Sequence, residues 1–254
     1  MHYGHAIARI PAITCAQGLT TSNLGSPDFA LTLQQFDAYI HTLLSLGLTV
    51  TTLPDQSAFP DSHFVEDTAV ITPEFALITH PGATSRRGEI HSIAPAIARH
   101  RVVMEFMSER AHMDGGDVLM VDKQFFVGLT SRTNEAGIAE LATLAESYGY
   151  TVHAIEVSEG LHLKSIVNYV GKNTLIMNEE GVNHPAFKGF NHIVLAKEEE
   201  YAGNTLWIND TLITPKGYPD TYQKIEKLGL PIISLDTSEF RKMDGGLTCL
   251  SLRF

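Results

Sequence analysis

The chain is poor in cysteine and tryptophan, with two cysteines and one tryptophan among its 254 residues. Two cysteines cannot build a disulfide framework in a chain of this length, so we expect Cys15 and Cys249 to be free thiols in a reducing compartment. No apolar run approaches the roughly 18 residues that span a bilayer, and the N-terminus lacks the pattern of a secretion signal. The sequence therefore predicts a cytoplasmic protein with no membrane segment.

Positive charge is also scarce. The 18 lysines and arginines face 29 aspartates and glutamates, which gives a formal net charge of −11 and argues against nucleic acid as a partner. An acidic balance suits a small cationic ligand, although it also serves simply to keep a protein soluble. Twelve histidines are present, but neither HExxH nor CxxC spacing occurs, so we predict no metal site.

The composition that remains is that of a globular protein. Hydrophobic residues make up 44% and charged residues 19% of the chain, and the length suits one large domain or two small ones. No low-complexity tract, charge block or linker divides the sequence. We therefore predict a single domain over residues 1–254.

A unit of two strands, a helix and a third strand recurs along the chain. Pairs of short strands joined by a turn are predicted at residues 68–79, 117–130 and 204–215. Helices are predicted at 28–46 and 220–228, and single strands at 49–53, 151–157 and 231–235. Each of these strands follows a glycine that fits a left-handed helix cap: Gly47, Gly149 or Gly229. A ββαβ unit at intervals of about 50 residues is typical of a radially repeated α/β architecture.

Cys249 is the first candidate functional residue. It lies in the segment 242–252, which reads KMDGGLTCLSL. Two glycines allow the backbone to approach a ligand closely, and the apolar residues around the thiol predict a buried strand that delivers sulfur to a cleft. The alternative is a small apolar core residue, because free cysteines are often buried for packing. A nucleophile requires histidine and carboxylate partners elsewhere in the chain.

Three segments offer such partners. Residues 161–165, LHLKS, contain His162 at the start of a predicted helical stretch over 162–170, where a packing role is equally open. Residues 64–68, FVEDT, contain Glu66 and Asp67, which a strand would turn to opposite faces. Residues 112–119, HMDGGDVL, place Asp114 before a glycine pair that leads into a strand.

Together and in this order, with SRRGE at 85–89 and LTSRTN at 129–134 between them, these motifs resemble the dimethylarginine dimethylaminohydrolases of the guanidino-modifying superfamily. The resemblance spans nearly the whole chain, from Gly18 to the last strand, and FVED, DGGDVL, LHLKS and DGG-x-x-C make it specific. It implies the pentein-like fold, an α/β propeller of five pseudo-symmetric ββαβ modules around a polar channel.

The resemblance also implies a catalytic set. Cys249 would be the nucleophile that forms a covalent thiouronium intermediate. His162 would protonate the leaving amine and then activate water, and Asp114 would hold this histidine in place.

The substrate-binding residues are implied in the same way. Asp67 would hold the guanidinium nitrogens and Glu66 would lie beside the substituted nitrogen, whereas Arg86 and Arg132 would bind the α-carboxylate. From the residues alone, a solvated helix start explains these arginines as well. Asp61 and the Leu19 carbonyl would lie near the α-amino group. Gly246, by its small size, would leave room for the methyl groups of the substrate.

The implied activity is hydrolysis of asymmetric dimethylarginine or monomethylarginine to citrulline and dimethylamine or methylamine, with no cofactor, by a monomer or homodimer. Alternatives are an arginine deiminase-like or amidinotransferase activity, or a non-catalytic binder of cationic amino acids. Against a deiminase, the histidine motif reads HLKS rather than HLDT, and the chain is too short for the helical region inserted in those enzymes.

Overall fold

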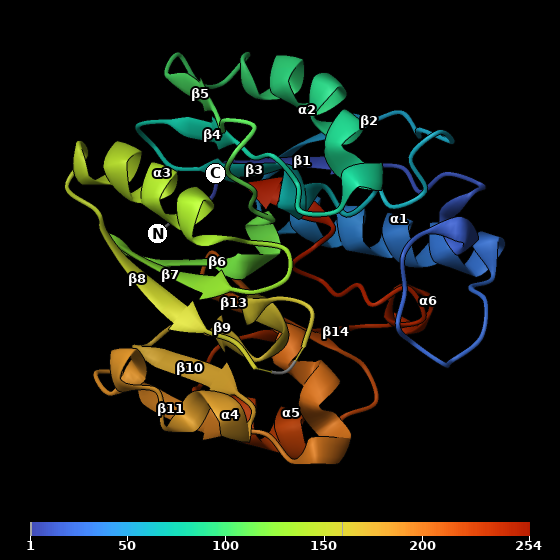
Figure 1. The fold of residues 1–254 in the computed structure, drawn as a ribbon. Helices are drawn as coiled ribbons and strands as arrows, with labels where there is room; N and C mark the ends of the chain where they lie inside the picture. The colour runs from blue at the N-terminus through green and yellow to red at the C-terminus, as the bar shows by residue number, and fades with distance from the viewer. Residues whose placement is uncertain (1, 159) are drawn as a thin grey trace.

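The structure is a computed structural model that describes residues 2–158 and 160–254. It contains five three-stranded sheets, and α1 to α5 follow one another around the outside in chain order (Figure 1). In every sheet the middle strand pairs antiparallel with one neighbour and parallel with the other. The predicted propeller of five ββαβ modules is confirmed.

The strands are short. The first two sheets contain β15 (Ser251–Arg253), β1 (His5–Arg9) and β2 (Thr49–Leu53), and β3 (Ala69–Ile71), β4 (Ala76–Ile78) and β5 (Met104–Phe106). The third and fourth contain β6 (Val118–Val121), β7 (Gln124–Leu129) and β8 (Thr151–Glu156), and β9 (Val167–Tyr169), β10 (Thr174–Met177) and β11 (Asn191–Val194). The fifth contains β12 (Leu206–Ile208), β13 (Thr211–Pro215) and β14 (Ile232–Leu235).

In each sheet a helix connects the middle strand to the neighbour that runs parallel to it. These helices are α1 (Phe29–Ser45), α2 (Ile90–Ile97), α3 (Glu135–Glu146), α4 (Glu179–Val182) and α5 (Pro219–Glu226). A sixth helix, α6 (Ser238–Arg241), precedes the last strand. Short 3-10 helices occupy Cys15–Gln17, Val65–Thr68, Thr84–Glu89, Gly115–Asp117, Leu163–Ser165, Pro185–Phe187 and Lys197–Asn204.

Local signals account for the correct helix and turn predictions. The Asp28 side chain caps α1 by accepting a hydrogen bond of 2.8 Å from the Leu31 backbone N–H. Gly47, Gly149 and Gly229 have φ of +87°, +76° and +64°, the left-handed caps that the sequence predicts.

Three local predictions were wrong. Residues 162–170 do not form a helix, because His162 caps the 3-10 helix Leu163–Ser165 and the chain then enters β9. The carboxylate pair Glu66 and Asp67 lies in a 3-10 helix rather than a strand. Cys249 lies in a turn that ends where β15 begins. Short segments fit either helix or strand by pattern alone, and residues 167–169 become a strand by pairing with the neighbouring β10.

The turn around Cys249 is anchored by its apolar neighbours. Leu247 and Leu250 are completely buried in a core cluster that also contains Phe36 and Leu43 of α1 and Ile213 of β13. Full burial of a leucine side chain stabilises a fold by roughly 1.5–3 kcal/mol. This packing fixes the turn against the core and leaves Cys249 only partly buried.

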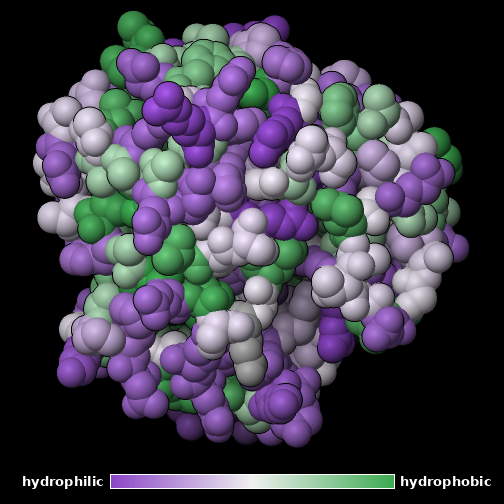
Figure 2. Space-filling view, viewed as in Figure 1, coloured by the Kyte–Doolittle hydropathy of each residue, from purple (hydrophilic) through white to green (hydrophobic). Residues whose placement is uncertain are grey.

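The face of the molecule shown in Figure 2 is mainly hydrophilic. On the face shown in Figure 2, hydrophobic residues form scattered patches among polar ones. None of the helices in the described part of the chain is both long enough and apolar enough to cross a membrane.

Candidate active site

One pocket brings together most of the predicted site. It is lined by Cys249, His162, Asp67, Arg86, Arg132, Asp61 and Leu19. These residues come from loops and 3-10 helices of several modules. The pocket therefore collects groups that are far apart in the sequence around one thiol.

The backbone of Cys249 is held by hydrogen bonds through both its N–H and its carbonyl group. Its N–H donates to the Gly246 carbonyl at 3.2 Å, and its carbonyl accepts from the Glu66 N–H at 3.2 Å. Burial raises the pKa of Cys249 well above its usual range, and the negative charges of Glu66 and Asp67 raise it further. The thiol is therefore in its neutral form at neutral pH.

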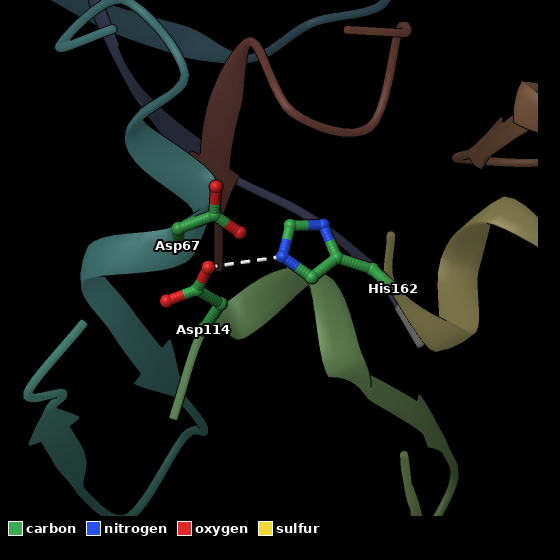
Figure 3. Close-up of side chains that lie close together, drawn as sticks. All are labelled: Asp67, Asp114 and His162. Carbon is green, nitrogen blue, oxygen red and sulfur yellow. Dashed lines mark hydrogen bonds and ion pairs between the residues drawn. The ribbon is translucent and has the colours of Figure 1, made fainter. Parts of the chain in front are cut away.

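His162 is bonded to Asp114 and faces Asp67 (Figure 3). Its Nε2 lies 2.9 Å from Asp114 Oδ2. Burial alone would lower the pKa of His162, but the negative charge of Asp67 and the bond to Asp114 outweigh it and raise the pKa to about 9. The imidazole is therefore protonated at neutral pH and can donate a proton. Among the described residues its Nδ1 has no hydrogen-bond partner, which leaves this atom available to a ligand.

Asp67 is fixed by two donors. Arg86 Nη1 forms an ion pair with Oδ2, and the Gly116 N–H donates to Oδ1 at 2.8 Å. Burial opposes ionisation of this carboxyl, but the positive charges of His162 and Arg86 hold its pKa below the usual value. Asp67 is thus an ionised carboxylate in the pocket, a partner for a planar cation.

The two predicted carboxylate-binding arginines differ. Arg86 is buried, and its Nε and Nη2 donate to Glu89 at 3.0 and 2.8 Å while Nη2 also donates to the Phe64 carbonyl at 2.8 Å. Arg132 has a side chain that is 16% exposed, and its Nη1 lies 3.8 Å from Asp114 Oδ2. Within the part of the chain that is described, the Arg132 guanidinium makes no hydrogen bond. Apart from its ion pair with Asp114, the Arg132 guanidinium therefore has donors that the described residues do not use.

Asp61 and Leu19 form the rim of the pocket. Both oxygens of the Asp61 carboxylate accept from the Leu19 N–H, each at 3.1 Å. A Cβ on Gly18 would lie 2.1 Å from Asp61 Oδ1, so a glycine is needed for this approach. The carboxylate holds the backbone of Leu19 against the pocket.

Two predicted binding residues lie outside this pocket. Glu66 lines a separate cavity of about 220 Å³, where its Oε1 pairs with Lys164 Nζ at 2.6 Å and Arg253 Nη2 at 2.7 Å. Gly246 lies against Asn204, whose Oδ1 would be 2.2 Å from a Cβ on Gly246. In this structure the missing side chain of Gly246 makes room for Asn204, and not for a ligand in the pocket.

The sequence analysis missed the apolar wall. Phe64, Leu161 and Met243 line the pocket beside Cys249 and His162. Each lies in or beside a motif whose polar residues alone indicate chemistry. Their positions in FVED, LHLKS and MDGG were the available signal.

One group of side chains has the spacing of metal ligands. In the described ranges, ligand atoms of Asp67, Asp114 and His162 all lie within 4.8 Å of one another (Figure 3). Protein donors already occupy these carboxylates, because Asp67 binds Arg86 and Asp114 accepts from the Gly82 N–H at 2.9 Å as well as from His162. The absence of a metal stays a prediction.

A thiol, an imidazolium and an ionised carboxylate in one pocket of a five-module α/β propeller define a guanidino-modifying enzyme. A family model described as "N,N dimethylarginine dimethylhydrolase, eukaryotic" matches residues 28–206. The dimethylarginine dimethylaminohydrolase of Pseudomonas aeruginosa is 42% identical over 253 residues, 99% of this chain and 100% of that protein. The Streptomyces coelicolor enzyme is 35% identical, over 98% of this chain and 96% of its own length.

Solved structures of related proteins support the same assignment. The P. aeruginosa enzyme, as a cysteine-to-serine variant with citrulline, superposes with a TM-score of 0.98 at 41% identity, over 100% of both chains. The N-terminal domain of the arginine dihydrolase ArgZ from cyanobacteria, at 14% identity, covers 98% of this chain and 97% of that one with a TM-score of 0.88 and shows the fold alone. The chain belongs to the dimethylarginine dimethylaminohydrolase family and is a hydrolase of methylated arginine. The family prediction is confirmed.

Proposed function

We propose that Cys249 and His162 carry out a two-step hydrolysis of Nω-methylated arginine to citrulline and methylamine or dimethylamine, in the cytoplasm and without a cofactor. The observation that carries the proposal is the shared pocket of these two residues with the ionised Asp67. The relative from P. aeruginosa was solved with citrulline bound, which supports the identity of the product. For the assembly we propose a monomer or homodimer.

In the first step the substrate guanidinium lies against Asp67. Its positive charge lowers the pKa of the Cys249 thiol, which releases its proton to solvent and attacks the guanidinium carbon as a thiolate. A carbon–sulfur bond forms, and the bond from carbon to the methylated nitrogen breaks. The protonated His162 donates its proton to the departing amine, in keeping with its pKa of about 9.

In the second step the neutral His162 takes a proton from water. The resulting hydroxide attacks the carbon of the thiouronium adduct, the carbon–sulfur bond breaks, and Cys249 leaves as a thiolate. The added hydroxyl group loses its proton to give the neutral carbonyl, and the thiolate takes up a proton to restore the thiol. The product is the ureido group of citrulline. Asp114 keeps the imidazole in position through both steps by its bond to Nε2.

The α-carboxylate of the substrate binds Arg132, whose guanidinium has donors that the described residues do not use, and Asp61 and the Leu19 carbonyl receive the α-amino group. Arg86 acts mainly by holding Asp67. Its bonds to Asp67, Glu89 and Phe64 use four of its five N–H groups, which leaves one Nη1 N–H for the carboxylate.

The substrate class is tested by citrulline formation from arginine, monomethylarginine, asymmetric dimethylarginine and agmatine. We expect kcat/KM for the methylated arginines to exceed that for arginine by more than tenfold, or about 1.4 kcal/mol. The reason is that a methyl group keeps the cation and adds contacts with the apolar wall of Phe64, Leu161 and Met243. Equal or faster turnover of arginine would favour the deiminase alternative, and transfer of the amidino group to an added amine would favour the amidinotransferase.

Replacement of Arg132 by alanine tests carboxylate recognition. We expect kcat/KM for methylarginine to fall by roughly 10- to 100-fold, since a charge-assisted hydrogen bond contributes about 1.5–3 kcal/mol. Agmatine, which has no carboxylate, should be a poor substrate of the unmodified enzyme and should lose little further. Arg87→Ala is the control, because Arg87 does not line the pocket and donates to the Pro81 carbonyl. An equal loss with both substrates would remove Arg132 from carboxylate binding.

A further inference from the structure

We propose that Asp117 is a positioning residue that holds both His162 and Arg132 in place through one buried carboxylate. The proposal rests on the roles given above to His162 and Arg132. Asp117 does not line the pocket, and its side chain is completely buried at the end of the 3-10 helix Gly115–Asp117.

The Asp117 carboxylate accepts three hydrogen bonds from two other segments. Its Oδ1 accepts from the Leu163 N–H at 2.9 Å. Its Oδ2 accepts from the hydroxyls of Thr130 at 2.8 Å and Thr133 at 2.6 Å. A Cβ on Gly128 would lie 2.7 Å from Oδ1, so the glycine in β7 gives the carboxylate its space.

The first arm of this network reaches His162. Leu163 directly follows His162, and the bond to its N–H fixes the backbone at the point where the imidazole leaves the chain. Asp114 is held from the same side, because the Asp117 N–H donates to the Asp114 carbonyl at 3.0 Å. The histidine and its carboxylate partner therefore share one anchor.

The second arm reaches Arg132 through the hydroxyl of Thr130, and the hydroxyl of Thr133 links Asp117 to Asp114. Thr130 Oγ1 donates to the Asp117 carboxylate and accepts from the backbone N–H of Arg132 at 3.0 Å. Thr133 Oγ1 donates to Asp117 and accepts from the Asp114 N–H at 3.2 Å. An asparagine amide oxygen could accept from both hydroxyls, but its NH2 group would then face the Leu163 N–H, so an uncharged amide cannot make all three bonds.

The charge of Asp117 also acts on His162. The groups that face the imidazole are Asp67 from Val65–Thr68, Asp114 and Asp117 from the 112–119 segment, and Cys249 from the last turn. Arg132 Nη1 lies 3.8 Å from Asp114 Oδ2, the same oxygen that bonds to His162. Asp117 thus adds negative charge behind the histidine without contact with a ligand, which helps to keep the imidazole protonated.

The test compares Asp117→Asn, Thr130→Val and the control Glu199→Gln. Glu199 also accepts backbone N–H groups and a threonine hydroxyl, from Asp220 and Thr221, but it does not line the pocket. The measurements are kcat and KM for asymmetric dimethylarginine across neutral and alkaline pH, and the titration of the His162 ring by NMR. Thermal unfolding shows whether each variant folds.

For Asp117→Asn we expect kcat to fall by roughly 10- to 100-fold, the effect of misplacing a catalytic group. The alkaline limb of kcat/KM and the NMR titration of His162 should both move to lower pH, because a negative charge has been removed. Thr130→Val breaks only the second arm, so it should raise KM several-fold and leave the alkaline limb unmoved. Glu199→Gln should change neither.

A uniform loss of kcat in Asp117→Asn, with an unmoved His162 titration, would overturn the proposal and assign Asp117 to stability alone. If Asp117→Asn does not fold, the proposal is tested by Thr130→Val. An unchanged KM of Thr130→Val for asymmetric dimethylarginine would overturn the link between Asp117 and Arg132. The NMR titration needs no turnover. It therefore still tests Asp117 if the enzyme does not act on methylarginine, and that failure would be seen separately in the unmodified protein.

Discussion

Cys249→Ser is expected to abolish citrulline formation while the protein stays folded. A serine hydroxyl at neutral pH is a far weaker nucleophile than a thiolate, and even a bound cation cannot ionise it. The fold should persist because Leu247 and Leu250 anchor the turn independently of the thiol. Steady-state assays give the loss of turnover, and mass spectrometry of acid-quenched enzyme should find a substrate adduct on Cys249 in the unmodified protein only.

The matched control is Cys15→Ala, which removes the other free thiol. Cys15 is buried in the core cluster beside α1 and does not line the pocket, so this variant should retain the adduct and the activity. Appreciable citrulline production by Cys249→Ser would contradict the covalent mechanism.

His162→Ala should lower kcat by roughly 10²- to 10⁴-fold, the range of general acid–base catalysis. Both steps need this group, first as the acid for the amine and then as the base for water. His153→Ala is the control, because His153 stacks on Phe126 away from the pocket. Near-normal turnover by His162→Ala would exclude it from proton transfer, whereas partial rescue by added imidazole would support the role.

The same residue determines the expected pH dependence. The free enzyme needs His162 protonated, and its pKa is raised to about 9, so kcat/KM should be sustained through neutral pH and fall above about pH 9. Without the surrounding carboxylates a buried histidine would lose its proton at much lower pH. A fall in kcat/KM already near the ordinary histidine pKa of about 6.5 would contradict this electrostatic account.

The repeat was predictable wherever a local signal marks it. Asn209 and Asp210 adopt positive φ in the β12–β13 turn, and both are residues that tolerate this conformation. The fourth module was misread because β9 has only three residues, with a polar Asn168 at its centre, and becomes a strand by pairing with β10. Closure of the first sheet by β15 is a contact between distant segments, which no local pattern specifies.

The site was predictable to the level of its motifs, but the direction of individual side chains was not. Glu66 and Asp67 are neighbours, yet only Asp67 lines the pocket. The difference arises because Lys164 and Arg253 pair with Glu66 from distant parts of the chain, while Arg86 pairs with Asp67. Electrostatic partners brought together by the fold therefore decide which carboxylate faces a ligand.

Pairing of β15 with β1 has a consequence for the timing of activity. Ala6 and Arg253 are partners across this sheet. The edge of β1 that pairs with β15 therefore stays unpaired until almost the whole chain has been synthesised. Cys249 lies directly before β15 and reaches the pocket only when that strand docks. A chain that ends before β15 also lacks Cys249, so we expect it to have no activity even where the other site residues are present. Pairing of the first sheet and supply of the nucleophile therefore depend on the same last segment of the chain.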